Sequence, residues 1–172
     1  MYVISMMKRT IIFLAIIVCC FSCNNETGYK EFTSEQDWFT IQLPDNWSET
    51  KDNEGTYIFY DEENWKGTFR ITPIRLDSRK VKDTVTDLLA RQLKDKASKG
   101  AKMVKIGDFD CVFYKEYVQE TSGEVLMYKW TLGSSNTVFL VSYATKKEIE
   151  ATESHPEELR QVENVIKSLQ IK

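Results

Sequence analysis

The chain has 172 residues, of which 42% are hydrophobic and 12% aromatic, enough material for one packed domain of ordinary size. Its 26 acidic residues outnumber its 23 basic ones, and no cluster of lysine and arginine offsets this balance. The sequence therefore lacks the basic surface that nucleic-acid binding needs, and we predict no nucleic-acid partner.

The first 22 residues are predicted to be a secretory signal. Lys8 and Arg9 form a positive start, and residues 10–18 follow as an apolar run. This run is too short to cross a bilayer core, which takes ~20 residues. A positive start, a short apolar run and then small residues are typical of a segment that is removed on export.

The run Cys20-Phe21-Ser22-Cys23 has a small residue directly before its last cysteine. It resembles, in a looser form, the lipobox of bacterial lipoproteins, Leu-(Ala/Ser)-(Gly/Ala)-Cys. The resemblance implies that Cys23 receives a diacylglyceryl group, that residues 1–22 are cut off, and that the new amine is acylated, for example with palmitate. Several acyl chains anchor a protein stably where a single chain does not.

The expected product is a lipoprotein of the bacterial cell envelope, with its lipid anchor as the membrane contact. Asn24 differs from the Asp that retains enteric lipoproteins in the inner membrane, which favours the outer membrane. A plain cleaved signal with a soluble product is the alternative. We predict a lipidated cysteine and polar tether over 23–37, followed by a single domain over 38–172.

The cysteines predict no internal disulfide. Cys19 and Cys20 leave with the signal and Cys23 carries lipid, so Cys111 has no partner in the mature chain. Cys111 lies in a predicted strand beside Val112 and Phe113, and nothing near it in sequence would lower its pKa. We expect it to be a buried and unreactive thiol.

The first part of the domain has the period of β-strands. "WFTIQL" (38–43) alternates up to Pro44, where "PDNW" turns the chain, and Tyr29 and Phe32 before it are placed to form a short edge strand. "TYIFYD" (56–61) and "TFRITPIRL" (68–76) flank the turn "EENWKG" and predict a hairpin. Pro73 lacks an amide donor, so its strand should be an edge strand or be broken there.

The period then becomes helical, with Gly100 following as a C-cap. We predict an amphipathic helix that packs on a sheet. Its apolar stripe consists of Val81, Val85, Leu88, Leu89, Leu93 and Ala97.

Four further strands are predicted, at 101–106, 109–118, 125–132 and 137–145. The turns between them suit antiparallel hairpins. The last three carry apolar residues on both faces, so the sheet should be covered on both sides.

A second helix closes the chain. Ser154 and Glu157 have the spacing of a capping box, and Pro156 suits a first helical turn. The buried stripe is expected to be Leu159, Val162, Ile166 and Leu169.

The order of elements resembles the PsbP-like α+β sandwich, and especially the DcrB-like bacterial lipoproteins of that fold. The resemblance covers roughly residues 29–172. It implies an antiparallel sheet of about six to seven strands flanked by helices, a non-catalytic accessory, assembly or chaperone-like role, and no catalytic residues. The motifs that carry it are an apolar strand running into Pro-x-x-Trp and a last helix ending in Ser-Leu, here Phe39, Ile41, Leu43, Pro44, Trp47, Ser168 and Leu169.

Residues for catalysis or for metal binding are scarce. His155 is the single histidine and is expected to be exposed in the first turn of the last helix. Zinc-type spacing, a glycine-rich phosphate loop and a Gly-x-Ser-x-Gly elbow are all missing from the sequence. We therefore predict no catalytic residues, no metal and no cofactor.

Carboxylates offer the one route to an enzyme. Asp61, Glu62 and Glu63 cluster at a hairpin tip, and Asp108 and Asp110 flank Phe109. A glycosidase needs two such groups ~5–9.5 Å apart in a cleft. Residues at a tip are usually solvated, and weak calcium binding at 61–64 is a further alternative.

Aromatic residues are the remaining candidates for partner binding. Five on the last strands, Tyr114, Tyr117, Tyr128, Trp130 and Tyr143, are expected mainly to fill the interior, and the alternative is that they line a ligand groove. Trp65 and Trp47 are the candidates for binding a partner. Trp65 lies in a polar turn that does not require its burial, and the alternative is that its ring folds back beside Tyr57 or Phe69.

The sequence thus favours a non-enzymatic envelope lipoprotein, a monomer that binds a protein or a small ligand through a face of its sheet. An immunity or chaperone-like protein for a secreted toxin is one alternative. A carboxylate-based hydrolase of cell-wall or glycan material is another.

Overall fold

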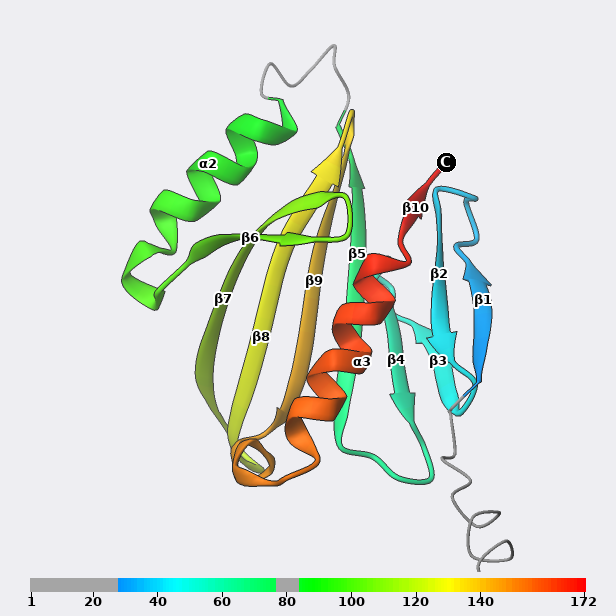
Figure 1. Cartoon of the computed structure of the whole chain (residues 1–172), viewed down its shortest axis with the longest axis vertical. Coiled ribbons are helices and arrows are strands. Elements are labelled where there is room, and N and C mark those ends of the chain that lie inside the picture. The colour runs from blue at the N-terminus through cyan, green and yellow to red at the C-terminus, as the bar shows by residue number, and fades with distance from the viewer. Residues whose placement is uncertain (1–27, 77–83) are drawn as a thin grey trace, which may run out of the picture.

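The computed structural model describes residues 28–76 and 84–172; the predicted signal, Cys23 and Val81 lie outside these ranges. A seven-stranded antiparallel sheet with the order β3-β4-β5-β9-β8-β7-β6 forms the body of the domain (Figure 1). Its strands are β3 (Trp47–Lys51), β4 (Tyr57–Asp61), β5 (Gly67–Arg75), β6 (Lys102–Ile106), β7 (Phe109–Glu120), β8 (Gly123–Ser134) and β9 (Thr137–Lys146).

A smaller sheet and two α-helices make up the rest of the fold within the described residues (Figure 1). The small sheet has the order β1-β2-β10. The remaining elements are β1 (Tyr29–Thr33), β2 (Phe39–Pro44), α2 (Val85–Asp95), η1 (Ala97–Lys99), η2 (Lys147–Ala151), α3 (His155–Lys167) and β10 (Gln170–Ile171).

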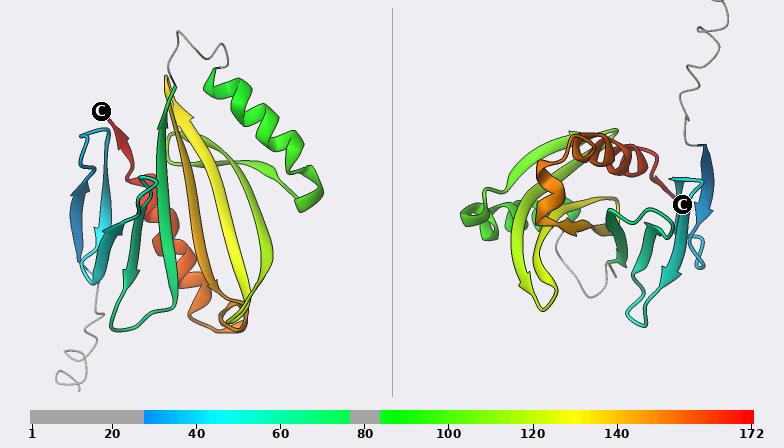
Figure 2. Two further views of the ribbon diagram at one scale, coloured as in Figure 1. Left: turned by 180° about the vertical axis from the view of Figure 1, so that it is seen from behind. Right: turned by 90° about the horizontal axis from the view of Figure 1, so that it is seen from below.

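The main sheet buries apolar side chains on both faces. We call the face that packs against α3 and the small sheet the inner face, and the face that packs against α2 the outer face (Figure 2). Neighbouring residues alternate between them: Cys111 and Phe139 belong to the inner core, whereas Val112 and Val138 pack with α2. The α+β class, the strand number and the two covered faces are therefore confirmed.

The helix α2 begins with a capping box. The Thr84 hydroxyl accepts the Asp87 amide proton at 3.2 Å, and the Asp87 carboxylate accepts the Thr84 amide proton at 2.9 Å. Both bonds satisfy donors that the first turn leaves free. The chain then continues as η1, and Gly100 ends it with a positive φ of 72°. The predicted helix is confirmed within the described residues, with Gly100 capping η1 rather than α2.

The helix α3 begins differently from its prediction. Ser154 has helical dihedral angles and its side chain makes no capping bond, so the predicted capping box is wrong. Glu157 pairs instead with Arg160, at 2.5 Å. Pro156 does lie in the first turn, and Val162, Ile166 and Leu169 are buried as expected.

The strand β5 is neither broken at Pro73 nor placed at the edge of the sheet. It pairs with β9 along its whole length, whereas its pairing with β4 ends at Ile71, opposite Tyr57. Pro73 therefore lies where β5 has one neighbour, and its missing amide proton is tolerated there.

The small sheet brings both ends of the domain together. Strand β10 pairs with β2, the Ser168 hydroxyl accepts the Gln42 amide proton at 2.8 Å, and the Lys172 amide donates to the Trp38 carbonyl at 3.0 Å. The two motifs that carry the resemblance are thus in direct contact.

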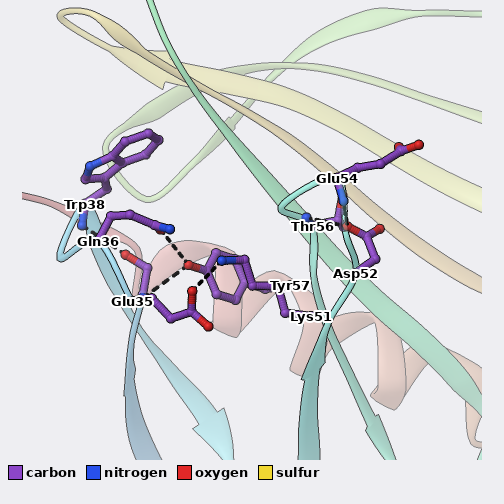
Figure 3. Close-up of polar contacts among 9 residues, drawn as sticks. Glu35, Gln36, Trp38, Lys51, Asp52, Glu54, Thr56 and Tyr57 are labelled. Carbon is purple, nitrogen blue, oxygen red and sulfur yellow. Dashed lines mark hydrogen bonds and ion pairs between the residues drawn. The ribbon is translucent and has the colours of Figure 1, made fainter.

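Polar contacts fix the β1–β2 turn to the β3–β4 hairpin (Figure 3). The Tyr57 hydroxyl donates to the Gln36 side chain at 2.8 Å and accepts the Glu35 amide proton at 3.1 Å. Lys51 pairs with the Glu35 carboxylate at 2.5 Å. These contacts join the two sheets at the end of β2 and β3 that lies away from the β2–β3 turn.

Candidate functional site

A polar recess of about 190 Å3 opens where the β2–β3 turn, the β4–β5 hairpin and the first turns of α3 come together. Its lining is polar apart from one indole and one glycine. The residues of this polar recess are Asn46, Trp47, Asp61, Asn64, Lys66, Gly67, Tyr143, Glu158 and Gln161.

A buried carboxylate forms the floor of the polar recess. Glu158, which is 8% exposed, accepts the Tyr143 hydroxyl proton at 3.0 Å and pairs with the Lys66 ammonium at 3.2 Å. Burial, and then the adjacent Glu158 carboxylate, hold the pKa of Tyr143 well above its ordinary value. The tyrosine therefore stays a hydrogen-bond donor to the carboxylate.

Gly67 allows the hairpin to approach this floor. A Cβ atom at position 67 would lie 2.3 Å from both the Cζ atom and the hydroxyl oxygen of Tyr143. Only a residue without a side chain fits so close to a buried ring. The glycine thus holds Lys66 beside Glu158.

Asp61 organises the rim of the polar recess. One of its carboxylate oxygens accepts the amide protons of Glu63 and Asn64 at 3.0 and 2.9 Å, and the other accepts from the Asn46 side chain at 2.6 Å. These bonds make Asp61 the residue that orders the hairpin tip. Within the described residues, no group of three or more histidine, cysteine or acidic side chains is arranged to hold a metal.

Several groups of the polar recess have hydrogen-bonding capacity to spare. The Asn64 and Gln161 side chains and the Trp47 indole N–H have no hydrogen-bond partner among the residues that the structure describes. The Lys66 side chain is 39% exposed beside them. The recess therefore combines an internally satisfied floor with unengaged groups around it.

The two predicted partner-binding residues lie apart. Trp47 is 8% exposed, packs against Phe69 with ring centroids 6.0 Å apart, and lines the polar recess. Trp65 is 43% exposed; its indole N–H donates to the Thr68 hydroxyl at 3.1 Å, and Lys146 lies 5.9 Å from its ring. These neighbours place Trp65 on the outer face, away from Trp47.

Replacing Trp65 by Ala should change the free energy of unfolding by less than about 1 kcal/mol, because the ring is largely solvated and makes one side-chain hydrogen bond. Thermal melts of the variant and the wild type measure this. Trp47→Ala is the opposite control and should lower the melting temperature clearly. A large loss from Trp65→Ala would make that residue structural; its role as a partner contact stays a prediction.

His155 is not exposed, so that prediction is wrong. It is 4% exposed, and its Nε2 atom lies 2.8 Å from the Tyr128 hydroxyl oxygen. The reason is geometric: the first turn of α3 packs down onto the inner face, and His155 falls on the same side of the helix as Glu158 and Val162.

The aromatic residues of the last strands are mostly interior, as expected. Tyr114, Tyr128, Trp130 and Tyr143 are buried. Tyr117 is the exception: it is exposed and donates a hydrogen bond to Glu150 at 2.9 Å.

Cys111 is fully buried, and burial raises the pKa of its thiol to about 12. We expect no reaction with a maleimide in the native state and rapid reaction after unfolding. Cys111→Ser should cost about 1–3 kcal/mol if the hydroxyl finds no partner. Fast labelling of the native protein would contradict the burial.

The same thiol predicts a pH dependence of stability. Its pKa is higher in the folded than in the unfolded chain, so its contribution is complete below the unfolded value of ~8.5 and is lost as the pH rises towards 12. Urea denaturation at pH 8 and 10.5 measures the loss. Cys111→Ala should reduce it, and an equal loss in that variant would assign the effect to other groups.

Lys66, Glu158 and Gln161 of the polar recess were not anticipated from the sequence, whereas Tyr143 is one of the aromatic residues named as able to line a ligand groove. One signal was present. Glu158 precedes Val162, Val165 and Leu169 at helical spacing, so it occupies the apolar stripe of α3 and was due to be buried.

The comparison with protein families matches residues 27–172 to the family described as "Domain of unknown function (DUF3805)". The chain belongs to this family. No curated protein matches the sequence significantly. Within the described residues of this family member, no helix is long and apolar enough to cross a membrane.

Three solved structures are similar to the chain. A protein of Bacteroides thetaiotaomicron is 30% identical with a TM-score of 0.67; the match covers 85% of the chain but about half, 49%, of that protein. LpqN of Mycobacterium tuberculosis, described as involved in cell envelope biogenesis, is 10% identical with a TM-score of 0.53, over 87% of this chain and 93% of LpqN.

The third structure is the cyanobacterial PsbP of Synechocystis, which is 13% identical with a TM-score of 0.47, over 88% of this chain and 98% of that protein. The DUF3805 domain has the α+β fold that its sequence predicts, and it shares that fold with LpqN. At such low identity LpqN bears on the fold alone.

Proposed function

We propose that this DUF3805 protein is a non-enzymatic lipoprotein of the cell envelope that binds a small, neutral, hydroxyl-rich ligand, such as the end unit of a glycan, in the polar recess. The observation that carries the proposal is which groups of the recess are already hydrogen-bonded. Its carboxylates are engaged with the protein, whereas the side-chain amides of Asn64 and Gln161 and the Trp47 indole N–H are unengaged.

The hydrogen-bonding groups that are free in the polar recess indicate the chemical class of the ligand. The side-chain amides of Asn64 and Gln161 each offer donors and an acceptor, and hydroxyl groups can both accept and donate. A free anion would meet two carboxylates in the recess, Asp61 and Glu158, against the single cation of Lys66. A neutral polyhydroxylated ligand satisfies these amides without burying a charge.

The size of the polar recess limits the ligand. Its volume of about 190 Å3 lies below the ~300–1,000 Å3 that is usual for drug-sized ligands. One ring or one end group fits this space better than an internal stretch of a long chain.

One observation bears on the hydrolase alternative, because Asp61 and Glu158 both line the polar recess. A hydrolase needs one carboxyl to give a proton and another to attack or to activate water. Each of the four carboxylate oxygens here already accepts a hydrogen bond or an ion pair from the protein. This engagement supports binding rather than hydrolysis.

The test is saturation-transfer NMR on the chain from Asn24, which contains every described strand and helix, with glucose, galactose, mannose and N-acetylglucosamine. We expect transfer from at least one sugar to the wild type. The double variant Asn64→Ala, Gln161→Ala should lose it, whereas Gln119→Ala, an exposed residue outside the recess, should retain it. No transfer from any of these sugars, or equal transfer in the double variant, would refute the proposal.

Cys23→Ala should abolish acyl labelling of the cellular protein and leave unprocessed precursor, because the proposed anchor is attached to that cysteine. Metabolic labelling with a palmitate analogue measures this, and fractionation places the product in the inner or outer membrane. Cys111→Ala is the matched control. Equal labelling of Cys23→Ala and the wild type would remove the anchor from the proposal.

A further inference from the structure

A second concavity lies on the outer face, beside the part of the main sheet next to α2. It has a volume of about 320 Å3. A row of cross-strand neighbours from four adjacent strands lines it. In order across the sheet, these residues are Arg70 (β5), Ser142 (β9), Lys129 (β8) and Tyr114 (β7). We call this concavity the outer hollow.

Arg70 is an uncompensated cation in this row. It is half-buried on a strand inside the sheet, and its cross-strand neighbours are Ile58 and Ser142. It makes no ion pair or hydrogen bond through its side chain with the described residues. A guanidinium has five N–H donors, and partial burial without a protein acceptor costs free energy. A ligand that supplies acceptor atoms would lower this cost.

Of the other charged groups in the outer hollow, Lys129 is paired, whereas Asp52 is hydrogen-bonded to the backbone and keeps its negative charge. Lys129 pairs with Glu116 at 2.5 Å, and Glu116 also pairs with Lys99. Asp52 lines the hollow as well, but its carboxylate accepts the amide protons of Glu54 and Thr56, both at 2.9 Å. The two cations of the lining, Arg70 and Lys129, thus exceed its one carboxylate in a protein whose net charge is -3.

Apolar groups adjoin the free guanidinium. Leu140 is 43% exposed although it lies on the central strand β9, and Met127 is half-buried on β8. Both line the outer hollow, one on each side of the row of Arg70 and Lys129. An exposed leucine alone would be ordinary. Next to an unpaired arginine in a concavity, it gives the site a cationic end that can bind an anion and an apolar end.

We propose that the outer hollow binds a small amphiphilic organic anion, with its carboxylate on Arg70 and its apolar body over Leu140. A carboxylate matches the guanidinium fork with two parallel hydrogen bonds, and the Ser142 hydroxyl is next to it to donate a third. This site shares no residue with the polar recess. The proposed anion binding can therefore be tested independently of the proposed sugar binding.

The experiment is a titration of the chain from Asn24 with octanoate, followed by the amide signals in 15N NMR spectra. We expect saturable shifts centred on residues 70, 129, 140 and 142. The neutral probe 1-octanol, which has the same chain length, should bind at least about tenfold more weakly, because it lacks the charge-assisted bonds to Arg70.

Two variants with the same change of charge complete the test. Arg70→Gln should weaken octanoate binding at least about tenfold, whereas Lys146→Gln, on the same face but outside the outer hollow, should change it less than about twofold. Their native spectra check the fold. Absence of saturation by octanoate, equal binding of octanol, or an unaffected Arg70→Gln variant would each overturn the proposal.

Discussion

Replacing Phe139 by Ala should lower the free energy of unfolding by about 3–5 kcal/mol. Phe139 is fully buried on the inner face, and its ring meets that of Phe39 edge to face with centroids 5.4 Å apart. It therefore connects the main sheet to the small sheet, and its removal leaves a cavity between two layers that cannot both close around it. Urea denaturation of the variant and the wild type measures the loss.

Leu140 supplies the matched control, since it is the next residue of β9 and points to the opposite face. Its side chain is 43% exposed, so Leu140→Ala should cost less than about 1 kcal/mol. The pair tests the assignment of the two faces directly. Equal losses from both substitutions would mean that β9 does not alternate between core and surface as described.

Replacing Glu158 by Ala should cost about 2–4 kcal/mol. The change leaves the buried Tyr143 hydroxyl without its acceptor and Lys66 without its counter-ion. Lys66 is partly solvated, so the stranded hydroxyl contributes much of the loss. Thermal and urea unfolding give the magnitude.

The neighbouring Glu157 is the control for this substitution. It is solvent-exposed and pairs with Arg160 within one turn of α3, so Glu157→Ala should cost no more than about 0.5 kcal/mol. If the two substitutions cost the same, the carboxylate on the floor of the polar recess would be no more than a surface charge.

The periodic elements were predictable because their own residues carry the signal. The strands β5, β7, β8 and β9 and the helix α2 each have runs of apolar side chains at the right spacing. The strands β3 and β10 were not predicted. Of the five residues of β3, only Trp47 is buried, and β10 has two residues, so both depend on pairing with β4 and β2.

Single residues of the polar recess could be predicted from the sequence, but their arrangement could not. The sequence indicated Trp47 and Asp61 as separate candidates in two different turns. Their proximity to Glu158 depends on how α3 crosses the sheet. Periodicity tells which face of an element is buried, but not which residues of other elements it meets there. The same limit explains His155, whose burial follows from its contact with Tyr128 on β8.

The pairing of β2 with β10 has a consequence for the timing of folding. Thr40 is aligned with Gln170, and Phe39 with Ile171, so β2 pairs with a strand about 130 residues further along the sequence. A chain that emerges from its N-terminus lacks this partner until Gln170 and Ile171 are free. Contacts between such distant segments form slowly. The small sheet is therefore complete only after these two residues are available.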